Sequence, residues 1–254
     1  MGGDFYRQNG VELRDSHRQC PAHDGIQSRT QQKEAITMQT ISIIGGTGSL
    51  GSGLAWRFAQ AGNKVIIGSR DAERAAETAT DINRKLGKDL AQGMDNDAAA
   101  AAGDIIVLTI KFNHQKSTLA QLHDAVQGKI VVDTTVPLVP PKVARVQLPP
   151  EGSAGLITQQ LLGENVQVVS AFQNIAADSL PGDAPITCDV LVTGDSKDAR
   201  EAVIQIARAS GMRAWHAGPL ANSVAAEAMT SLLIHLNKQF PGAHTGIKIT
   251  GIPD

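Results

Sequence analysis

Short apolar runs alternate with Ala-rich segments of helical periodicity from residue 38 onward. The runs are nearly continuous in Val, Ile and Leu, a pattern typical of parallel strands that are covered on both faces. They read TISIIGG, NKVIIGS, GDIIVLTI, GKIVVDTT and VQVVSAF. Helices are predicted between them at Leu50–Ala61, Ala72–Leu86, Asp97–Ala102, His114–Val126 and Ser153–Leu162. This order predicts the α/β class, with a Rossmann-type doubly wound parallel sheet.

A second, smaller α/β unit follows. Its predicted strands read ITCDVLVTG and MRAWHAG, and its predicted helices are Lys197–Ala209 and Ser223–Phe240. We therefore expect a Rossmann domain at 38–180 and a small C-terminal domain at 181–254. Residues 1–37 show neither helical nor strand periodicity and are rich in Gly, Gln, Arg, Asp and Ser, which predicts a disordered leader. Met38 stands directly before the first strand, so a start site at this residue stays open.

The last predicted helix carries an apolar stripe at four-residue spacing. The stripe consists of Val224, Ala228, Leu232, Leu236 and Phe240. Such a stripe indicates a packing face, either against the Rossmann domain or against another subunit. We expect a homo-oligomer that forms through this helix.

Composition narrows the functional classes. The formal net charge is −2 and no basic stripe is present, so nucleic acid is not an expected partner. No apolar segment reaches the length of about 18 residues that a membrane helix needs, and the predicted location is the cytoplasm. Cys20 and Cys188 are too few for a disulfide framework, and no Cys or His cluster has the spacing of zinc ligands. No metal site is predicted.

The segment IIGGTGSLGSGLA places Gly46, Gly48 and Gly51 between a predicted strand and a predicted helix. In that setting Gly46 takes the tight turn, Gly48 lets the backbone approach a pyrophosphate, and Gly51 lets the helix pack on the strand. The first N–H groups of the helix then face the phosphates. The motif predicts a dinucleotide-binding site, with an unliganded glycine-rich turn as the alternative.

The end of the second strand indicates which dinucleotide binds. Ser69 and Arg70 stand where NAD-binding proteins usually have an acid, and Arg74 follows one helical turn later. A hydroxyl and two guanidinium groups suit the 2′-phosphate of NADP. Asp71 and Glu73 leave an alternative, in which all these charges form a solvated helix start.

Several separated segments, taken in order, resemble the NADPH-dependent reductases of the deazaflavin coenzyme F420. They read GGTGSLGSGLA, GSRDAERA, DIIVLTI, VVDTTVPL, AFQNIAA and AGPLANS, with GIKI near the end. The resemblance covers residues 38–249. It implies a Rossmann domain plus a small C-terminal domain, and a hydride that passes between NADP and a deazaflavin stacked in the cleft between them.

The resemblance also implies which residues bind the two cofactors. Those matching the pyrophosphate loop are Thr47, Gly48, Ser49 and Leu50. Those matching the 2′-phosphate site are Ser69, Arg70 and Arg74. Val136 and Ala177 match further NADP contacts, and Leu220 matches a deazaflavin contact.

Two positions depart from the family pattern. Lys111 and Phe112 stand where the family often has IPW or VPY, and Gln173 stands where it has His. A glutamine donates a hydrogen bond but cannot act as an acid or a base. Because hydride transfer between flat rings depends on orientation and water exclusion, no catalytic side chain is predicted.

We expect an apolar acceptor cleft framed by Ile110, Phe112, Val136 and Leu220. A site of this kind favours a flat, redox-active small molecule over a small alcohol. Three functions remain open. The chain is an oxidoreductase for coenzyme F420, an NADPH-dependent reductase of another flat acceptor such as a flavin or quinone, or a non-catalytic NADP sensor.

Overall fold

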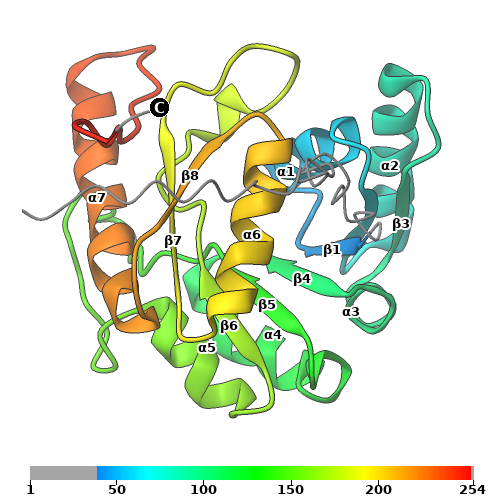
Figure 1. Ribbon diagram of the computed structural model, residues 1–254, viewed down its shortest axis with the longest axis horizontal. Helices are drawn as coiled ribbons and strands as arrows, with labels where there is room; N and C mark the ends of the chain where they lie inside the picture. The colour runs from blue at the N-terminus through cyan, green and yellow to red at the C-terminus, as the bar shows by residue number, and fades with distance from the viewer. Residues whose placement is uncertain (1–38, 253–254) are drawn as a thin grey trace, which may run out of the picture. The chain divides into compact units, whose positions relative to one another are not determined.

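The apolar runs of the sequence form the centre of one sheet in the computed structural model, which describes residues 39–252. The strands of this part of the chain lie in the order β3-β2-β1-β4-β5-β6-β7-β8 (Figure 1). Their bounds are β1 Thr40–Ile44, β2 Lys64–Ser69, β3 Ala91–Asp95, β4 Ile105–Leu108, β5 Ile130–Asp133, β6 Gln167–Ser170, β7 Asp189–Gly194 and β8 Arg213–His216. All neighbouring pairs are parallel except β6 and β7. The predicted α/β, Rossmann-type class is confirmed, with one antiparallel pair in the sheet.

Helices cover both faces of this sheet. The helices of the described chain are α1 Ser49–Gln60, α2 Ala72–Leu86, α3 Asn96–Ala102, α4 Gln115–Leu122, α5 Ala154–Leu162, α6 Lys197–Ala209 and α7 Ser223–Gln239. Ile41 and Ile43 of β1 lie in a core that also contains residues of α1, α2 and α6. Ile44 belongs to the core on the other face, with residues of α3, α4 and α5. Because side chains alternate along a strand, each central strand serves both cores.

Most predicted helices agree with the structure to within a residue or two. The predicted helix His114–Val126 is an exception, because only Gln115–Leu122 is α-helical. Short 3₁₀ turns, η1 Phe112–His114 and η2 Asp124–Val126, flank it. Such turns are common at helix ends, where the i→i+4 bonds run out.

Strand β3 is absent from the predicted elements, because its sequence AQGMD has no apolar run. Its central residue is Gly93, and a Cβ atom there would lie 2.1 Å from the carbonyl carbon of Ala75. The glycine therefore lets α2 lie directly on β3. This edge strand is held by close backbone packing rather than by the Val- and Ile-rich pattern of the inner strands.

The apolar stripe of α7 packs on its own chain only at its start, where Val224 and Ala228 are partly buried and Val224 Cγ2 would lie 3.4 Å from a Cβ on Gly152. The side chains of Leu232, Leu236 and Phe240 are 56%, 40% and 61% exposed. The face of α7 that is buried carries small and polar side chains, namely Ser223, Ala226, Glu227 and Ser231. Contact with another subunit stays a prediction.

The predicted boundary between residues 180 and 181 falls between β6 and β7. These two strands pair through Val169 with Gly194 and Ser170 with Thr193, so the sheet continues across the boundary. Thr37–Asp254 forms one compact unit. A separate small domain at 181–254 stays a prediction, and the predicted leader at 1–37 lies outside the described residues.

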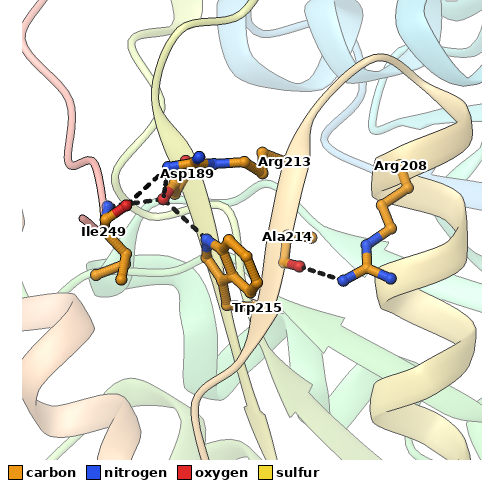
Figure 2. Close-up of polar contacts among 6 residues, drawn as sticks. All are labelled: Asp189, Arg208, Arg213, Ala214, Trp215 and Ile249. Carbon is orange, nitrogen blue, oxygen red and sulfur yellow. Dashed lines mark hydrogen bonds and ion pairs between the residues drawn. The ribbon is translucent and has the colours of Figure 1, made fainter. Parts of the chain in front are cut away.

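Asp189 fixes the end of the described chain to β7 and β8 (Figure 2). Its carboxylate is 1% exposed and accepts hydrogen bonds from Arg213 Nε (2.7 Å), Trp215 Nε1 (2.8 Å) and the Ile249 N–H (2.7 Å). Arg213 also donates to the Ile249 carbonyl oxygen over 2.8 Å. Burial alone would raise the pKa of Asp189, but these donors outweigh it and lower the pKa. The GIKI segment is thus anchored by a satisfied, buried network.

Candidate active site

A cleft of about 530 Å³ opens where β1, β2 and β4 end. In a doubly wound sheet, ligands bind at the carboxyl ends of the strands where the strand order reverses. Here the reversal lies between β1 and β4. The residues predicted to bind cofactor that line this cleft are Thr47, Gly48, Ser69, Arg70, Arg74 and Ile110.

The glycine turn after β1 is built by close backbone contacts. Gly45, not Gly46, takes the left-handed conformation, with φ of +76°. A Cβ on Gly46 would lie 2.8 Å from the Ile43 carbonyl oxygen, and one on Gly51 would lie 2.6 Å from the Gly46 Cα. The role predicted for Gly51 agrees with this contact, whereas the left-handed turn belongs one residue earlier than expected.

Gly48 differs from the other glycines of the motif. The nearest atom to a methyl group added at this residue would be the Gly45 carbonyl oxygen at 3.5 Å, an ordinary van der Waals distance. Its φ of −77° is open to any residue. The folded chain itself therefore does not require a glycine at this position, which lines the cleft. A residue without a side chain at this position leaves the backbone open to close approach by a ligand.

Gly48 is also the N-cap of α1, and it offers no side chain to the first turn of the helix. The first turn, which begins Ser49, Leu50, Gly51, contains no acidic residue. The leading N–H groups of a helix have no intrahelical partners, and the helix dipole makes this end positive. The arrangement suits the pyrophosphate of a dinucleotide.

The end of β2 presents a hydroxyl and two cations to the same cleft. Ser69 is 7% exposed, and Arg70 and Arg74 are exposed. Asp71 is occupied as the N-cap of α2, where it accepts from the Arg74 N–H over 3.1 Å. Within residues 39–252 neither guanidinium group makes an ion pair. Both remain available for an anionic ligand.

The other predicted contact residues lie outside this cleft. Phe112 is partly buried in η1, and Ala177 lies in the short turn η3 Ala177–Ser179, which is near α1. Val136 lines a cavity of only about 10 Å³ that it shares with Glu227. Ile110 and Val136 thus line two different cavities, and an acceptor cleft framed by Ile110, Phe112, Val136 and Leu220 stays a prediction.

Leu220, the residue predicted to contact the deazaflavin, is buried in the described chain, and its contact stays a prediction. Its side chain is 0% exposed and lies in the core on the α3, α4 and α5 face. The residue begins the turn η4 Leu220–Asn222, and its N–H donates to Asp195 Oδ1 over 3.0 Å. The side chain points toward α5, where a Cβ on Gly155 would lie 3.3 Å from its Cδ1. Leu220 packs in this core, and its turn η4 contacts β6 and β7.

A buried polar network stands at the ends of β5 and β6. The Asp133 carboxylate is 0% exposed and accepts from Gln115 Nε2 (2.9 Å), Thr158 Oγ1 (2.5 Å) and the Thr135 N–H (2.7 Å). Gln173 Nε2 donates to the Asp133 carbonyl oxygen over 3.0 Å. It also donates to Ser170 Oγ over 2.6 Å. The side-chain amide of Gln173 therefore holds the two strand ends together.

Glu227 of α7 is a buried acid near this network. It is 2% exposed, and its carboxylate accepts from the N–H groups of Ala154 (2.7 Å) and Gly155 (3.0 Å) at the start of α5. Burial raises the pKa of Glu227 to about 8, and the charge of Asp133 acts in the same direction, although the N–H donors oppose it. This carboxyl group connects α7 to α5.

Several residues that line the cleft are not found by sequence reasoning. They are Asn96, Thr109, Ser117, Thr118 and Gln121. Lys111 and His114 line the cleft as well. Asn96 follows the unpredicted strand β3, and Ser117, Thr118 and Gln121 lie on α4. No local motif marks these positions, because the fold brings them to the cleft from separate elements.

Comparison with known proteins agrees with this geometry. The family described as NADP oxidoreductase, coenzyme F420-dependent, matches residues 40–137. The F420-dependent NADP reductase of Methanocaldococcus jannaschii is 42% identical over 221 residues, which cover 84% of this chain and 98% of the relative. The enzyme of the same name from Methanothermobacter thermautotrophicus is 40% identical and covers 86% of this chain and 98% of the relative. The fold and site define a dinucleotide-dependent oxidoreductase. The chain belongs to the F420-dependent NADP reductase family.

A solved structure shows the same fold. The crystal structure of a putative F420-dependent NADP reductase from Arthrobacter sp. FB24 matches with a TM-score of 0.69 at 23% identity, over 84% of this chain and 99% of that one. Within residues 39–252 no helix is both long and apolar enough to cross a membrane. The same residues contain no cluster of His, Cys, Asp and Glu suited to a metal ion.

Proposed function

We propose that this protein transfers a hydride between NADP(H) and the deazaflavin coenzyme F420. The observation that carries the NADP half is the pair of unpaired guanidinium groups, Arg70 and Arg74, beside Ser69 at the end of β2. The deazaflavin half rests on the family, because its curated members are named F420-dependent NADP reductases.

The residues present fit NADP. The turn around Gly48 leaves room for a pyrophosphate against the backbone, and the start of α1 supplies N–H donors. Ser69, Arg70 and Arg74 bind the 2′-phosphate through charge-assisted hydrogen bonds. When bound, NADPH supplies the hydride. The chain binds and orients it, and no described side chain is needed as an acid or base.

The fit to the deazaflavin is less complete, because Ile110 and Val136 line different cavities and Leu220 is buried. We assign no deazaflavin contact to Leu220, which is fully buried. Of the predicted wall, Ile110 lines the dinucleotide cleft and Val136 lies beside Glu227. The acceptor is therefore assigned from the family and not from the geometry.

A spectrophotometric assay tests the proposal. NADPH is mixed with the purified protein and coenzyme F420, and the loss of the deazaflavin's visible absorbance is followed. Parallel reactions contain FMN, a soluble quinone, or a carbonyl or imine compound. We expect reduction of the deazaflavin and a slower reaction with the flavin. Transfer to the carbonyl or imine compound without transfer to the deazaflavin would contradict the proposal, and no transfer to any acceptor would favour an NADP sensor.

We further propose a homo-oligomer formed through α7. Its exposed side chains Leu232, Leu236 and Phe240 are apolar, and Val146 and Leu148 lie close to this helix around the small cavity beside Glu227. A second copy of the chain would remove this surface from water. Light scattering is expected to give more than one chain per particle, and Phe240→Glu is expected to shift the particle toward the monomer.

Two further predictions belong with this proposal. A cytoplasmic location is tested by fractionating cells that express the protein. The division at residues 180 and 181 is tested by expressing residues 38–180 alone, which fold and bind NADP only if the Rossmann part is an independent domain.

A further inference from the structure

We propose that Lys111 binds the pyrophosphate of the dinucleotide. The inference rests on the proposed binding of a dinucleotide in the cleft where β1, β2 and β4 end. It assigns a cation to a part of the ligand for which neither the glycine motif nor the arginine pair supplies one. A contact of this kind strengthens the binding of NADP and of NAD alike, in contrast to the arginines at the end of β2.

Lys111 lies in the loop that follows β4, and this loop packs on the glycine turn. The N–H and Oγ1 groups of Thr109 both donate to the Ile44 carbonyl oxygen over 2.9 Å, which joins the loop to the end of β1. A Cβ on Gly45 would lie 3.0 Å from the Thr109 carbonyl oxygen, and one on Gly51 would lie 2.7 Å from Thr109 Oγ1. Lys111 follows shortly after Thr109 and lines the same cleft. It therefore stands beside the turn that receives the pyrophosphate.

The charges around the cleft leave the pyrophosphate without a side-chain cation of its own. The lysine and arginine residues that line the cleft are Arg70, Arg74 and Lys111, and the first two are assigned to the 2′-phosphate. Residues 45–56, which form the glycine turn and the start of α1, contain no charged side chain. The next residue of α1, Arg57, is buried and donates to backbone carbonyl oxygens elsewhere.

The start of α1 offsets only part of the negative charge. A helix N-terminus acts as about half of a positive charge, whereas each phosphate of the pyrophosphate carries a negative charge. A lysine ammonium beside the turn supplies a further positive charge and hydrogen-bond donors for the same oxygens. The cleft therefore has a place and a chemical reason for Lys111 as a pyrophosphate contact.

The side chain of Lys111 is exposed, and among the residues that the structure describes it makes no ion pair. Its backbone is held, because its carbonyl oxygen accepts from the His114 N–H over 2.9 Å where η1 begins. A lysine carries a compact charge on a flexible four-carbon stem, so the backbone fixes its origin while the ammonium group can follow the phosphates. Lys111→Met removes the charge and keeps the apolar stem. We expect it to change the ligand-free melting temperature by less than about 3 °C.

The affinities of three ligands, measured without an acceptor, test the inference. NADPH and NADH share the pyrophosphate, whereas 2′-AMP has the 2′-phosphate and no pyrophosphate. In displacement calorimetry, Lys111→Met is expected to weaken NADPH and NADH by the same factor of about tenfold, and 2′-AMP by less than about twofold. The loss is expected to shrink as salt is added, because the contact is between charges.

Two further variants show whether the charge at this position is responsible. Lys111→Arg keeps a cation and is expected to stay within about threefold of the wild type for both dinucleotides. Lys116→Met is the matched control, since Lys116 is an exposed lysine on the adjacent helix α4 that does not line the cleft. It is expected to leave all three affinities unchanged.

The outcomes separate the inference from the proposed function. If the wild type binds none of the three ligands, both fail together. If the wild type binds NADPH and NADH equally but Lys111→Met weakens both, the preference for NADP fails and the role of Lys111 stands. If Lys111→Met leaves both dinucleotides unaffected, or weakens only NADPH and 2′-AMP, the inference alone is overturned. An equal loss in Lys116→Met would overturn it as well, because the effect would then belong to the net charge of the protein.

Discussion

The arginines at the two ends of the sheet differ in how their charges are satisfied. Near β2, Arg70 and Arg74 line an open cleft and have no ion pair within residues 39–252. At the opposite end, Arg213 makes a two-pronged contact with the buried Asp189 carboxylate. Arg57 of α1 is 5% exposed and donates to the carbonyl oxygens of Leu180 and Ala184, each over 2.6 Å. Arg213 and Arg57 hold segments of the chain together, whereas Arg70 and Arg74 have no ion pair in the described residues and can bind an anion.

The largest expected effect lies at the satisfied end. Asp189→Asn removes the charge that balances Arg213. Breaking a fully buried ion pair costs more, but Arg213 is partly exposed, so we expect a loss of about 2–4 kcal/mol in the free energy of unfolding. The melting temperature is expected to fall by about 10 °C, while NADP affinity of the folded protein stays within about twofold. Asp124→Asn, at an exposed acid, is the control for charge loss. An unchanged melting temperature for Asp189→Asn would show that the network adds little.

The next effect lies at the open end and should appear in binding instead of stability. Arg70→Ala is expected to weaken NADP about ten- to a hundredfold, through the loss of a charge-assisted contact, and to leave NAD nearly unaffected. Calorimetric titration of both dinucleotides measures this. Arg84→Ala serves as the control, because Arg84 pairs with Asp81 and does not line the cleft. Equal losses for NADP and NAD would contradict the assignment of Arg70.

The buried carboxyl group of Glu227 is expected to make the stability of the fold depend on pH. Its folded-state pKa of about 8 lies above the ordinary value of 4.5, so the folded protein binds this proton more tightly than the unfolded chain does. The resulting stability is complete below the ordinary pKa and is lost as the pH rises toward the folded-state value. Between about pH 5 and pH 8 the wild type is expected to lose about 1–2 kcal/mol relative to Glu227→Gln. If the free energies of unfolding of the wild type and of Glu227→Gln change with pH in parallel, Glu227 does not cause the pH dependence.

The smallest predicted effect separates two glycines of the same motif. Gly48→Ala is expected to change stability by less than about 1 kcal/mol, because its methyl group meets only the Gly45 carbonyl oxygen at 3.5 Å. NADP affinity is expected to fall about tenfold, since the methyl group occupies space that the pyrophosphate needs. Gly46→Ala is the contrasting variant, because its methyl group would lie 2.8 Å from the Ile43 carbonyl oxygen and should destabilise the fold itself.

Local patterns predict what local interactions determine. The bounds of α2 agree with the sequence prediction because Asp71 caps its start and Gly87 ends it with φ of +63°. The glycine turn and the arginine pair are also predicted from the sequence, because each lies within one short segment. Strand β3 is not predicted from the sequence, because Gly93 is fixed by close packing against the α2 backbone. The residues of the strand itself do not reveal this tertiary contact.

The rest of the site depends on how separate elements meet. The family resemblance makes Leu220 a ligand contact, yet the turn at η4 directs it into the core. Asn96 has no motif around it, and it lines the cleft because it follows the unpredicted strand β3. Long-range packing decides both positions, and a single sequence does not reveal it.

The most direct test of the contrast between the two sets of arginines is the affinity of the wild-type protein for NADPH and for NADH. Isothermal titration of each dinucleotide, at one salt concentration and without an acceptor, isolates the contribution of the 2′-phosphate. If Arg70 and Arg74 are unpaired because that phosphate is their partner, NADPH should bind at least about tenfold more tightly, and the difference should shrink as salt is added. Equal affinities for NADPH and NADH would contradict the account.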